Sequence, residues 1–183
     1  MDSSSVVTCD IADSVDLNIP FQTVTERYYT PFYFCGKDHE DFRALQHSNK
    51  LFVITLAPTH SILKGKKTVT KVDFDVGPNS NRLENVVSGK GKRGAQFLMP
   101  DSLLCFIETS DGERYEVRSC VKGKLVEVNS LLVTNPSLIT SHPDSKGYIA
   151  IIICPLSAKN KEYEHLMNEK DYQKYSSELN NVQ

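Results

Sequence analysis

The chain has 183 residues, a formal net charge of -2 and 39% hydrophobic residues. This length fits one domain with short tails, and the hydrophobic content is sufficient for a single core. The near-neutral charge excludes a general electrostatic field for nucleic acid or membrane, so such a partner would need a local basic patch.

The five cysteines are scattered and form no Cys-x-x-Cys pair. We expect Cys105, Cys120 and Cys154 to lie in strands as small hydrophobic residues, which favours a reduced, intracellular compartment. No stretch approaches the ~20 consecutive apolar residues of a membrane-spanning helix, so no membrane partner is expected. The N-terminus lacks the basic and apolar regions of a signal peptide.

Residues 1–20 are rich in Ser and Asp, and we expect a disordered leader. Residues 26–34 then bring five aromatic rings in nine positions. These rings could pack across a sheet, or they could form a stacking platform for nucleic-acid bases. We favour packing, because no long basic groove accompanies the rings in the sequence.

The middle of the chain is typical of strands separated by turns. Residues 51–56 are an apolar run after a Ser-Asn turn, and residues 69–76 alternate between polar and apolar. Residues 105–109 and 114–118 also alternate. The intervening residues 110–113 contain Asp-Gly, the strongest short-range signal for a β-hairpin.

Two further strands are expected, one starting after Gly123 and one over residues 148–153, which ends before Pro155. A tight turn at Gly123 favours a residue that tolerates positive φ. The four side chains expected to point inward from these strands are Val126, Val128, Ile149 and Ile151.

The C-terminal residues indicate a helix. Asn168 is a good N-cap, and Asp171 is placed where a carboxylate favours the helix dipole. Tyr172, Tyr175 and Leu179 then share one apolar face. The expected organisation is a leader over 1–20, a β domain over 21–157 and a helical tail over 158–183.

The sequence holds residue types for three kinds of chemistry. Cys35, Asp38, His39 and His47 are metal-ligating types, but their spacing matches no established zinc pair, so we expect no metal site. Nothing supplies the orienting group of a Cys-His nucleophile, so we expect no catalytic residues and no enzyme. The sequence Gly89–Gly94 is glycine-rich and basic, yet a strand rather than a helix follows, which indicates an exposed basic turn rather than a phosphate loop.

The segment 119–129, Ser-Cys-Val-Lys-Gly-Lys-Leu-Val-Glu-Val-Asn, resembles lipoyl carrier domains, above all the glycine-cleavage H protein. The likeness continues through residues 135–139, 141–143 and 146–150. It implies a mainly β barrel-sandwich hybrid (single hybrid motif) with short C-terminal helices. Within this fold, we expect the hairpin halves 94–109 and 115–132 to interlock.

The carrier lysine of that family lies in a Glu-Thr-Asp-Lys-Ala turn. Here the corresponding residues 108–112 read Glu-Thr-Ser-Asp-Gly, which puts Asp111 at the lysine position, or Gly112 if the position is counted from the downstream side. Gly112 has no side chain that could carry a cofactor. A carboxylate cannot form an amide with lipoate or biotin. The resemblance therefore implies the carrier scaffold without its cofactor.

A closer resemblance covers residues 45–50, 53–57, 87–90, 92–98 and 110–113. By these runs the chain is similar to the abitram (simiate) family. The resemblance implies a non-enzymatic actin-binding protein that promotes filament assembly and filopodium dynamics. It also implies a place in nuclear speckles, cytoplasm and cell projections, with transcription-associated partners.

The carrier-like fold that the resemblance implies would place two basic turns on related hairpins, where they could form one cationic face. The candidate partner-binding residues of these turns are Lys90, Lys92, Arg93, Arg118, Lys122 and Lys124. Such a face suits actin, which is an acidic protein. Two alternatives stay open. The turns could bind nucleic acid or a transcription complex, or the chain could be a degenerate carrier that still docks on a carrier's enzyme partners.

Overall fold

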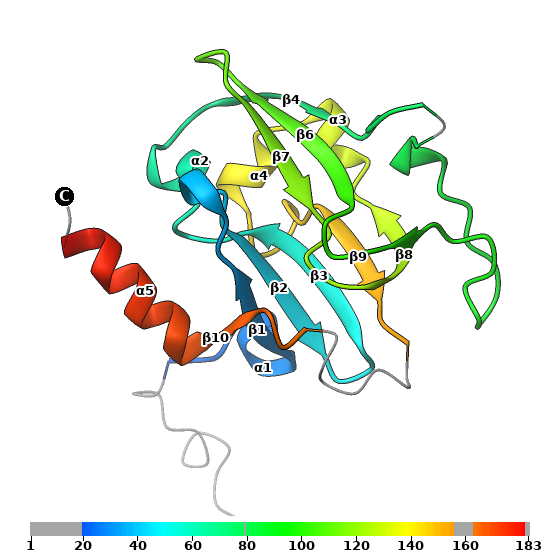
Figure 1. The fold of residues 1–183 in the computed structure, drawn as a ribbon, viewed down its shortest axis with the longest axis horizontal. Helices are drawn as coiled ribbons and strands as arrows, with labels where there is room; N and C mark the ends of the chain where they lie inside the picture. Colours follow the sequence, from blue (N-terminus) through cyan, green and yellow to red (C-terminus); the bar gives the residue numbers. More distant parts are fainter. Residues whose placement is uncertain (1–19, 79, 156–162, 182–183) are drawn as a thin grey trace, which may run out of the picture.

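The computed structural model describes residues 20–78, 80–155 and 163–181, so almost all of the predicted leader lies outside the described residues. Two antiparallel β-sheets pack against each other, and short helices lie at their margins (Figure 1). The mainly β, carrier-like architecture predicted from the sequence is confirmed.

Seven strands form the larger sheet, in the spatial order β10, β1, β2, β3, β9, β8, β5. In that order their bounds are Met167–Asn168, Tyr29–Phe34, Phe42–His47, Leu51–Leu56, Ala150–Ile153, Gly123–Val128 and Phe97–Leu98. The predicted strand over 51–56 is confirmed as β3. Its entry turn is closed by a hydrogen bond from the Lys50 amide to the His47 carbonyl, with Lys50 at φ 67°.

Three strands form the smaller sheet: β4 (Val69–Asp73), β6 (Leu103–Thr109) and β7 (Arg114–Arg118). The predicted hairpin is confirmed between β6 and β7, and Gly112 takes a φ of +85° at its tip. The predicted halves 94–109 and 115–132 are wrong as hairpins. β5 and β8 pair with each other in the larger sheet, whereas β6 and β7 belong to the smaller one.

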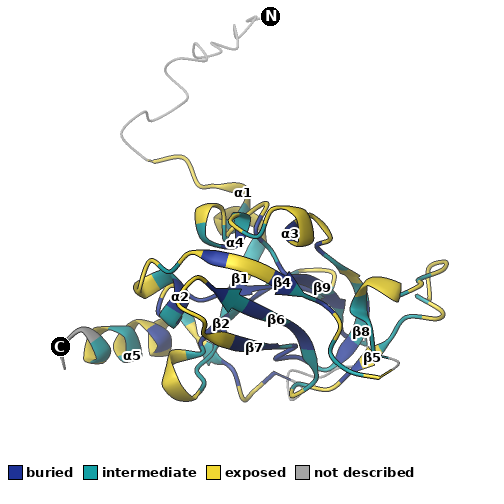
Figure 2. Ribbon diagram, turned by 90° about the horizontal axis from the view of Figure 1, so that it is seen from above, coloured by how far each residue is buried: buried dark blue, intermediate teal, exposed yellow. Residues whose placement is uncertain are grey.

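The core lies between the two sheets, and strands of both sheets contribute buried residues to it (Figure 2). Leu125 and Ile152 point into it from the larger sheet, and both are fully buried. Ile149 is also buried, as predicted, and the half-buried Val128 packs against the core. Val126 and Ile151 are half-buried and do not belong to the core cluster. The prediction is wrong for these two residues because the register shifts between Leu125 and Glu127, and because β9 is apolar on both of its faces.

Gly123 is needed for close packing, not for positive φ. A Cβ atom at this position would lie 2.5 Å from the Ile153 carbonyl oxygen. The left-handed residue of this turn is Cys120, with φ 59°. The expected positive φ at Gly123 is therefore wrong, although the requirement for glycine holds.

The helices are short except for α5 (Glu169–Asn181). Its predicted N-cap is confirmed, because the Asn168 side-chain oxygen accepts from the Asp171 amide at 3.0 Å. The others are α1 (Val24–Tyr28), α2 (Ser61–Lys64), α3 (Leu131–Thr134), α4 (Leu138–Ser141) and the 3₁₀ turns η2 (Lys37–His39) and η3 (Arg82–Glu84). Over the described residues, none of these helices has the length and apolar character to cross a membrane.

Candidate protein-binding surface

Ser88 to Arg93 form a tight loop, which we call the basic loop. The Ser88 and Arg93 backbones exchange hydrogen bonds of 2.9 and 3.0 Å. Gly89 (φ +63°) and Lys92 (φ 50°) take the left-handed conformations that the reversal needs. β5 follows at Phe97, so the predicted strand after this glycine-rich segment is confirmed.

One lysine from the larger sheet fixes the basic loop. The Lys124 ammonium donates to the Gly91 carbonyl at 2.8 Å, and it lies 3.4 Å from the Lys92 carbonyl. Lys124 belongs to β8, where it pairs with Phe97 of β5. The loop and the two strands thus form one structural unit.

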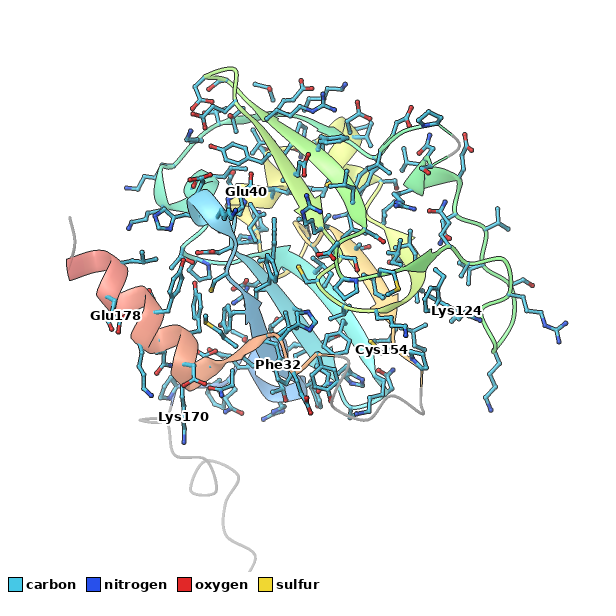
Figure 3. All side chains as sticks on the ribbon, viewed as in Figure 1. Phe32, Glu40, Lys124, Cys154, Lys170 and Glu178 are labelled. Carbon is cyan, nitrogen blue, oxygen red and sulfur yellow. The ribbon has the colours of Figure 1, made fainter. Side chains whose placement is uncertain are left out.

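A shallow groove of about 230 Å³ lies at this junction, and we call it the lysine groove. Three ammonium-bearing side chains and three apolar residues line most of it: Lys90, Lys92, Lys124, Phe97, Ile153 and Pro155. Figure 3 shows Lys124 and Cys154, which also borders the groove, on the same side of the molecule. The structure thus brings together three of the six sequence-predicted residues, and Arg93 is exposed at the base of the same loop.

The preceding segment is held against β8 by side-chain amides. The Asn85 amide nitrogen donates to the Leu125 carbonyl at 2.9 Å, and its oxygen accepts from the Gln96 amide at 2.8 Å. The Arg82 guanidinium donates to the Gln96 side chain and to the Leu103 carbonyl. These bonds position the residues on both sides of the basic loop.

The cations of this surface have no acidic partner among the described residues. None of Lys90, Lys92, Arg93 and Lys124 has a carboxylate oxygen within 4.0 Å of its charged nitrogens in that part of the chain. On a chain with a net charge of -2, this surface is a local concentration of unneutralised positive charge.

Arg118 lies elsewhere. Its guanidinium pairs with Glu116 at 2.6 Å and donates to the Asp101 carbonyl at 2.9 Å. Arg118 also lies close enough to Glu40 to lower the pKa of that carboxyl, against the raising effects of burial and of the Glu116 charge. Figure 3 shows Glu40 far from Lys124. Lys122 is half-buried in the turn before β8, outside the groove lining.

Exposed apolar side chains gather along the same stretch of sequence. Four of the large hydrophobic side chains are between 44% and 73% exposed here: Leu83, Val86, Phe97 and Met99. Of these four, Phe97 lies in the groove with Lys90, Lys92 and Lys124. Sequence reasoning found the lysines but missed these apolar residues, because single exposed hydrophobic residues are common in any sequence.

The position of the carrier lysine lies at the β6–β7 hairpin tip. Lys67 reaches this tip from outside the hairpin, and its ammonium donates to Asp111 at 2.7 Å and to Glu113 at 2.6 Å. The bond from Lys67 to Asp111, together with one from Thr109, lowers the pKa of Asp111 to about 2. The side chain in the lysine position is therefore a paired carboxylate.

The potential metal ligands and the aromatic segment singled out in the sequence form no second site among the described residues. Within the described residues, no group of three potential metal ligands comes together. Cys35 packs against Met167, and His47 lies 5.3 Å from the Tyr29 ring. Of the aromatic segment, Phe32 packs on Phe52 and Tyr163, which favours the packing interpretation over a stacking platform.

Comparison with known proteins supports the class that the fold indicates. The family model for the glycine cleavage H-protein matches residues 80–179. A crystal structure of a glycine cleavage system H protein from Mycobacterium marinum superposes with a TM-score of 0.52. It covers 80% of this chain and 96% of that chain at 12% identity, a likeness of fold alone. The protein is therefore an H-protein-like β domain.

Its relatives by sequence are named Protein Abitram. The protein from Gallus gallus is 42% identical over 149 residues, covering 80% of this chain and 86% of its own. The protein from Homo sapiens is 42% identical over 154 residues, covering 82% and 85%. The protein from Dictyostelium discoideum is 36% identical over 159 residues, covering 84% and 87%. The chain belongs to the Abitram family.

Proposed function

We propose that this chain is a non-enzymatic regulatory protein that binds actin and promotes filament assembly in cell protrusions. Its proposed locations are the cytoplasm, including cell projections, and nuclear speckles. Membership of the Abitram family supports this function, and the observation that carries it at the level of residues is the unneutralised cationic surface around the basic loop. Such a surface complements an acidic partner, and actin is acidic.

The position of Asp111 supports a function without carrier chemistry. The H-protein fold presents a hairpin tip on which a carrier would bear its lysine, and here that tip holds a carboxylate bonded to Lys67. We infer that the scaffold was retained for binding another protein. Docking on the enzyme partners of true carriers would be an alternative use of the same scaffold.

The test is a titration against purified monomeric actin. Single exposed ion pairs contribute only ~0.2–1 kcal/mol, so one substitution should hardly change the affinity. Reversing two charges with Lys92→Glu and Arg93→Glu adds repulsion and should weaken binding by roughly 1–3 kcal/mol, mainly through slower association. Lys64→Glu with Lys66→Glu is the matched control. It makes the same change in net charge, and Lys66, like Lys92, has positive φ.

Salt and nuclease separate the protein partner from nucleic acid. Wild-type binding to actin should weaken between low and physiological salt, because exposed charges are screened over ~8–10 Å. It should survive nuclease treatment. Nuclease-sensitive partners and a steep log-log dependence on salt would instead favour the nucleic-acid alternative. Equal actin affinity of wild type and the folded double variant would exclude this surface.

A further inference from the structure

We propose that the lysine groove binds an acidic peptide segment of a partner protein and holds one bulky apolar side chain of that segment between its lysines. This inference rests on the proposed function and names the kind of element that the surface recognises. Four properties of the groove carry it: volume, wall, charge and rigidity.

The volume selects a side chain over a larger ligand. The groove holds about 230 Å³, several times the ~30 Å³ that one water molecule occupies in the liquid. It is smaller than the ~300–1,000 Å³ of most sites for drug-sized molecules. A single aliphatic or aromatic side chain therefore fits the available space.

The wall is apolar and incompletely covered. Phe97 is 53% exposed although it lies in a strand, and Ile153 and Pro155 are half-buried beside it. The methylene stems of Lys90 and Lys92 extend this apolar surface, because lysine can bury its stem while its ammonium stays in water. An apolar side chain seated here would remove from water a surface that nothing among the described residues covers completely.

The rim selects the charge of the segment. Three lysines border the groove, and none of the described residues that line it is acidic. A segment with Asp or Glu on either side of its apolar residue would place negative charge opposite Lys90, Lys92 and Lys124. A basic segment would meet repulsion in the same place, so the rim supplies selectivity as well as attraction.

The groove is pre-organised for such a segment. Lys124 projects from a strand of the larger sheet, and its bond to the Gly91 carbonyl fixes the loop that carries the other two lysines. Little ordering is then needed on this side of the interface, which lowers the entropic cost of binding.

A protein segment fits better than single-stranded nucleic acid. Nucleic-acid grooves usually stack successive bases on several aromatic side chains. Among the described residues that line the groove, Phe97 is the single aromatic one, and its apolar neighbours in the lining, Ile153 and Pro155, cannot stack on a base. Apolar contact with one protein side chain needs no second ring.

The first test compares Phe97→Ser with Met99→Ser. The two residues have similar exposure, 53% and 51%, but Phe97 lines the groove and Met99 does not. In titrations with purified actin, Phe97→Ser should weaken binding at least tenfold, whereas Met99→Ser should change it less than twofold. Circular dichroism checks that both variants are folded. If actin binds Phe97→Ser as tightly as wild type, the inference is overturned and the proposed function stands.

The second test uses a probe in place of actin. The full-length ¹⁵N-labelled protein is titrated with the peptide acetyl-Asp-Asp-Leu-Asp-Asp-amide, and NMR shift changes are expected at the amides of Gly91 and Lys124. Replacing the leucine by serine, or the aspartates by lysines, should abolish these changes. If the peptide shifts these amides but the protein does not bind actin, the groove binds acidic apolar segments and its partner is a protein other than actin. Changes confined to other residues, or larger groove shifts with oligothymidylate, would overturn the inference.

Discussion

The aromatic ring of Tyr33 in β1 lies flat against that of Tyr172 in α5, with ring centroids 3.6 Å apart and planes inclined by 2°. Hydrogen bonds surround this stacked pair. The Tyr33 hydroxyl donates to Glu169 at 2.8 Å, and the Tyr172 hydroxyl accepts from the Thr59 amide at 3.2 Å. Most other side chains of α5 are exposed or half-buried. The attachment of α5 therefore depends on a small apolar contact centred on Tyr172.

Replacing Tyr172 by alanine should release α5. Truncating a buried aromatic residue removes its contacts and leaves a cavity, with a typical cost of about 3 kcal/mol. Amide hydrogen exchange over residues 169–181 should accelerate strongly while exchange in β3 and β9 changes little. Tyr28→Ala is the control, because Tyr28 is 54% exposed in α1. Unaltered exchange in α5 would show that other contacts hold the helix.

Adding one methyl group at Gly123 should destabilise the larger sheet. The new Cβ would lie 2.5 Å from the Ile153 oxygen and 2.8 Å from the Ile152 side chain, so β8 and β9 would have to separate. Overpacking of this kind costs about 1–3 kcal/mol, which urea unfolding would measure. Gly91→Ala should leave stability within ~0.5 kcal/mol, since nothing lies within 4 Å of its Cβ position. Equal stability of both variants would contradict the close packing.

Acid should destabilise the protein through His60. This residue is completely buried between the rings of Phe42 and Tyr115, and burial lowers the pKa of His60 to about 4. In the unfolded chain the pKa of this histidine is ~6.5. Between the two pKa values the unfolded chain therefore binds more protons than the folded chain. Stability is therefore lost as the pH falls from ~6.5 to ~4. The full loss is about 3 kcal/mol.

The variant His60→Asn isolates this contribution. An asparagine can still accept the hydrogen bond that the Ile62 amide donates to His60 at 3.1 Å, but it does not titrate in this range. Measured by urea unfolding, the free energy of unfolding of wild type minus that of His60→Asn should fall by about 3 kcal/mol between pH 7 and pH 4. His142→Asn, at an exposed position, controls for the loss of a histidine. An advantage independent of pH would contradict the mechanism.

The protein should carry no lipoyl or biotinyl group. The sequence resemblance to H proteins assigns the lysine position to Asp111, and neither cofactor can form its amide with a carboxylate. Protein made in a lipoylation-competent host should have the intact mass of the bare chain. A true H protein made in the same host is the positive control. A mass increase mapped to Lys67, the nearest lysine at the hairpin tip, would contradict the prediction.

Alternation and turn chemistry predicted the local elements well. The Asp-Gly turn located the β6–β7 hairpin, and Asn168 located the start of α5. The register of β8 against β9 could not be read in this way, because the irregularity after Leu125 changes which residues face the core. α1 was missed, although Thr23 and Glu26 form a capping box that the sequence displays.

For the candidate surface, the sequence predicted charge and not geometry. It located the glycine-rich basic turn, but it could not show that Lys124 bonds to that turn or that Phe97 lies between the lysines. The sequence position of Glu116 could have excluded Arg118 from the candidate surface. Glu116 is two residues away in the same strand, so both side chains share one face and can neutralise each other.

The pairing of β1 with β10 also has a consequence for biosynthesis. Tyr33 is registered opposite Met167, so the described segment that is synthesised last completes the edge next to the first strand. Until residues 167–181 leave the ribosome, the backbone of β1 lacks this partner and Tyr33 has no aromatic cover. A nascent chain at that stage exposes a sheet edge open to wrong pairing, and this exposure should end with the docking of β10 and α5.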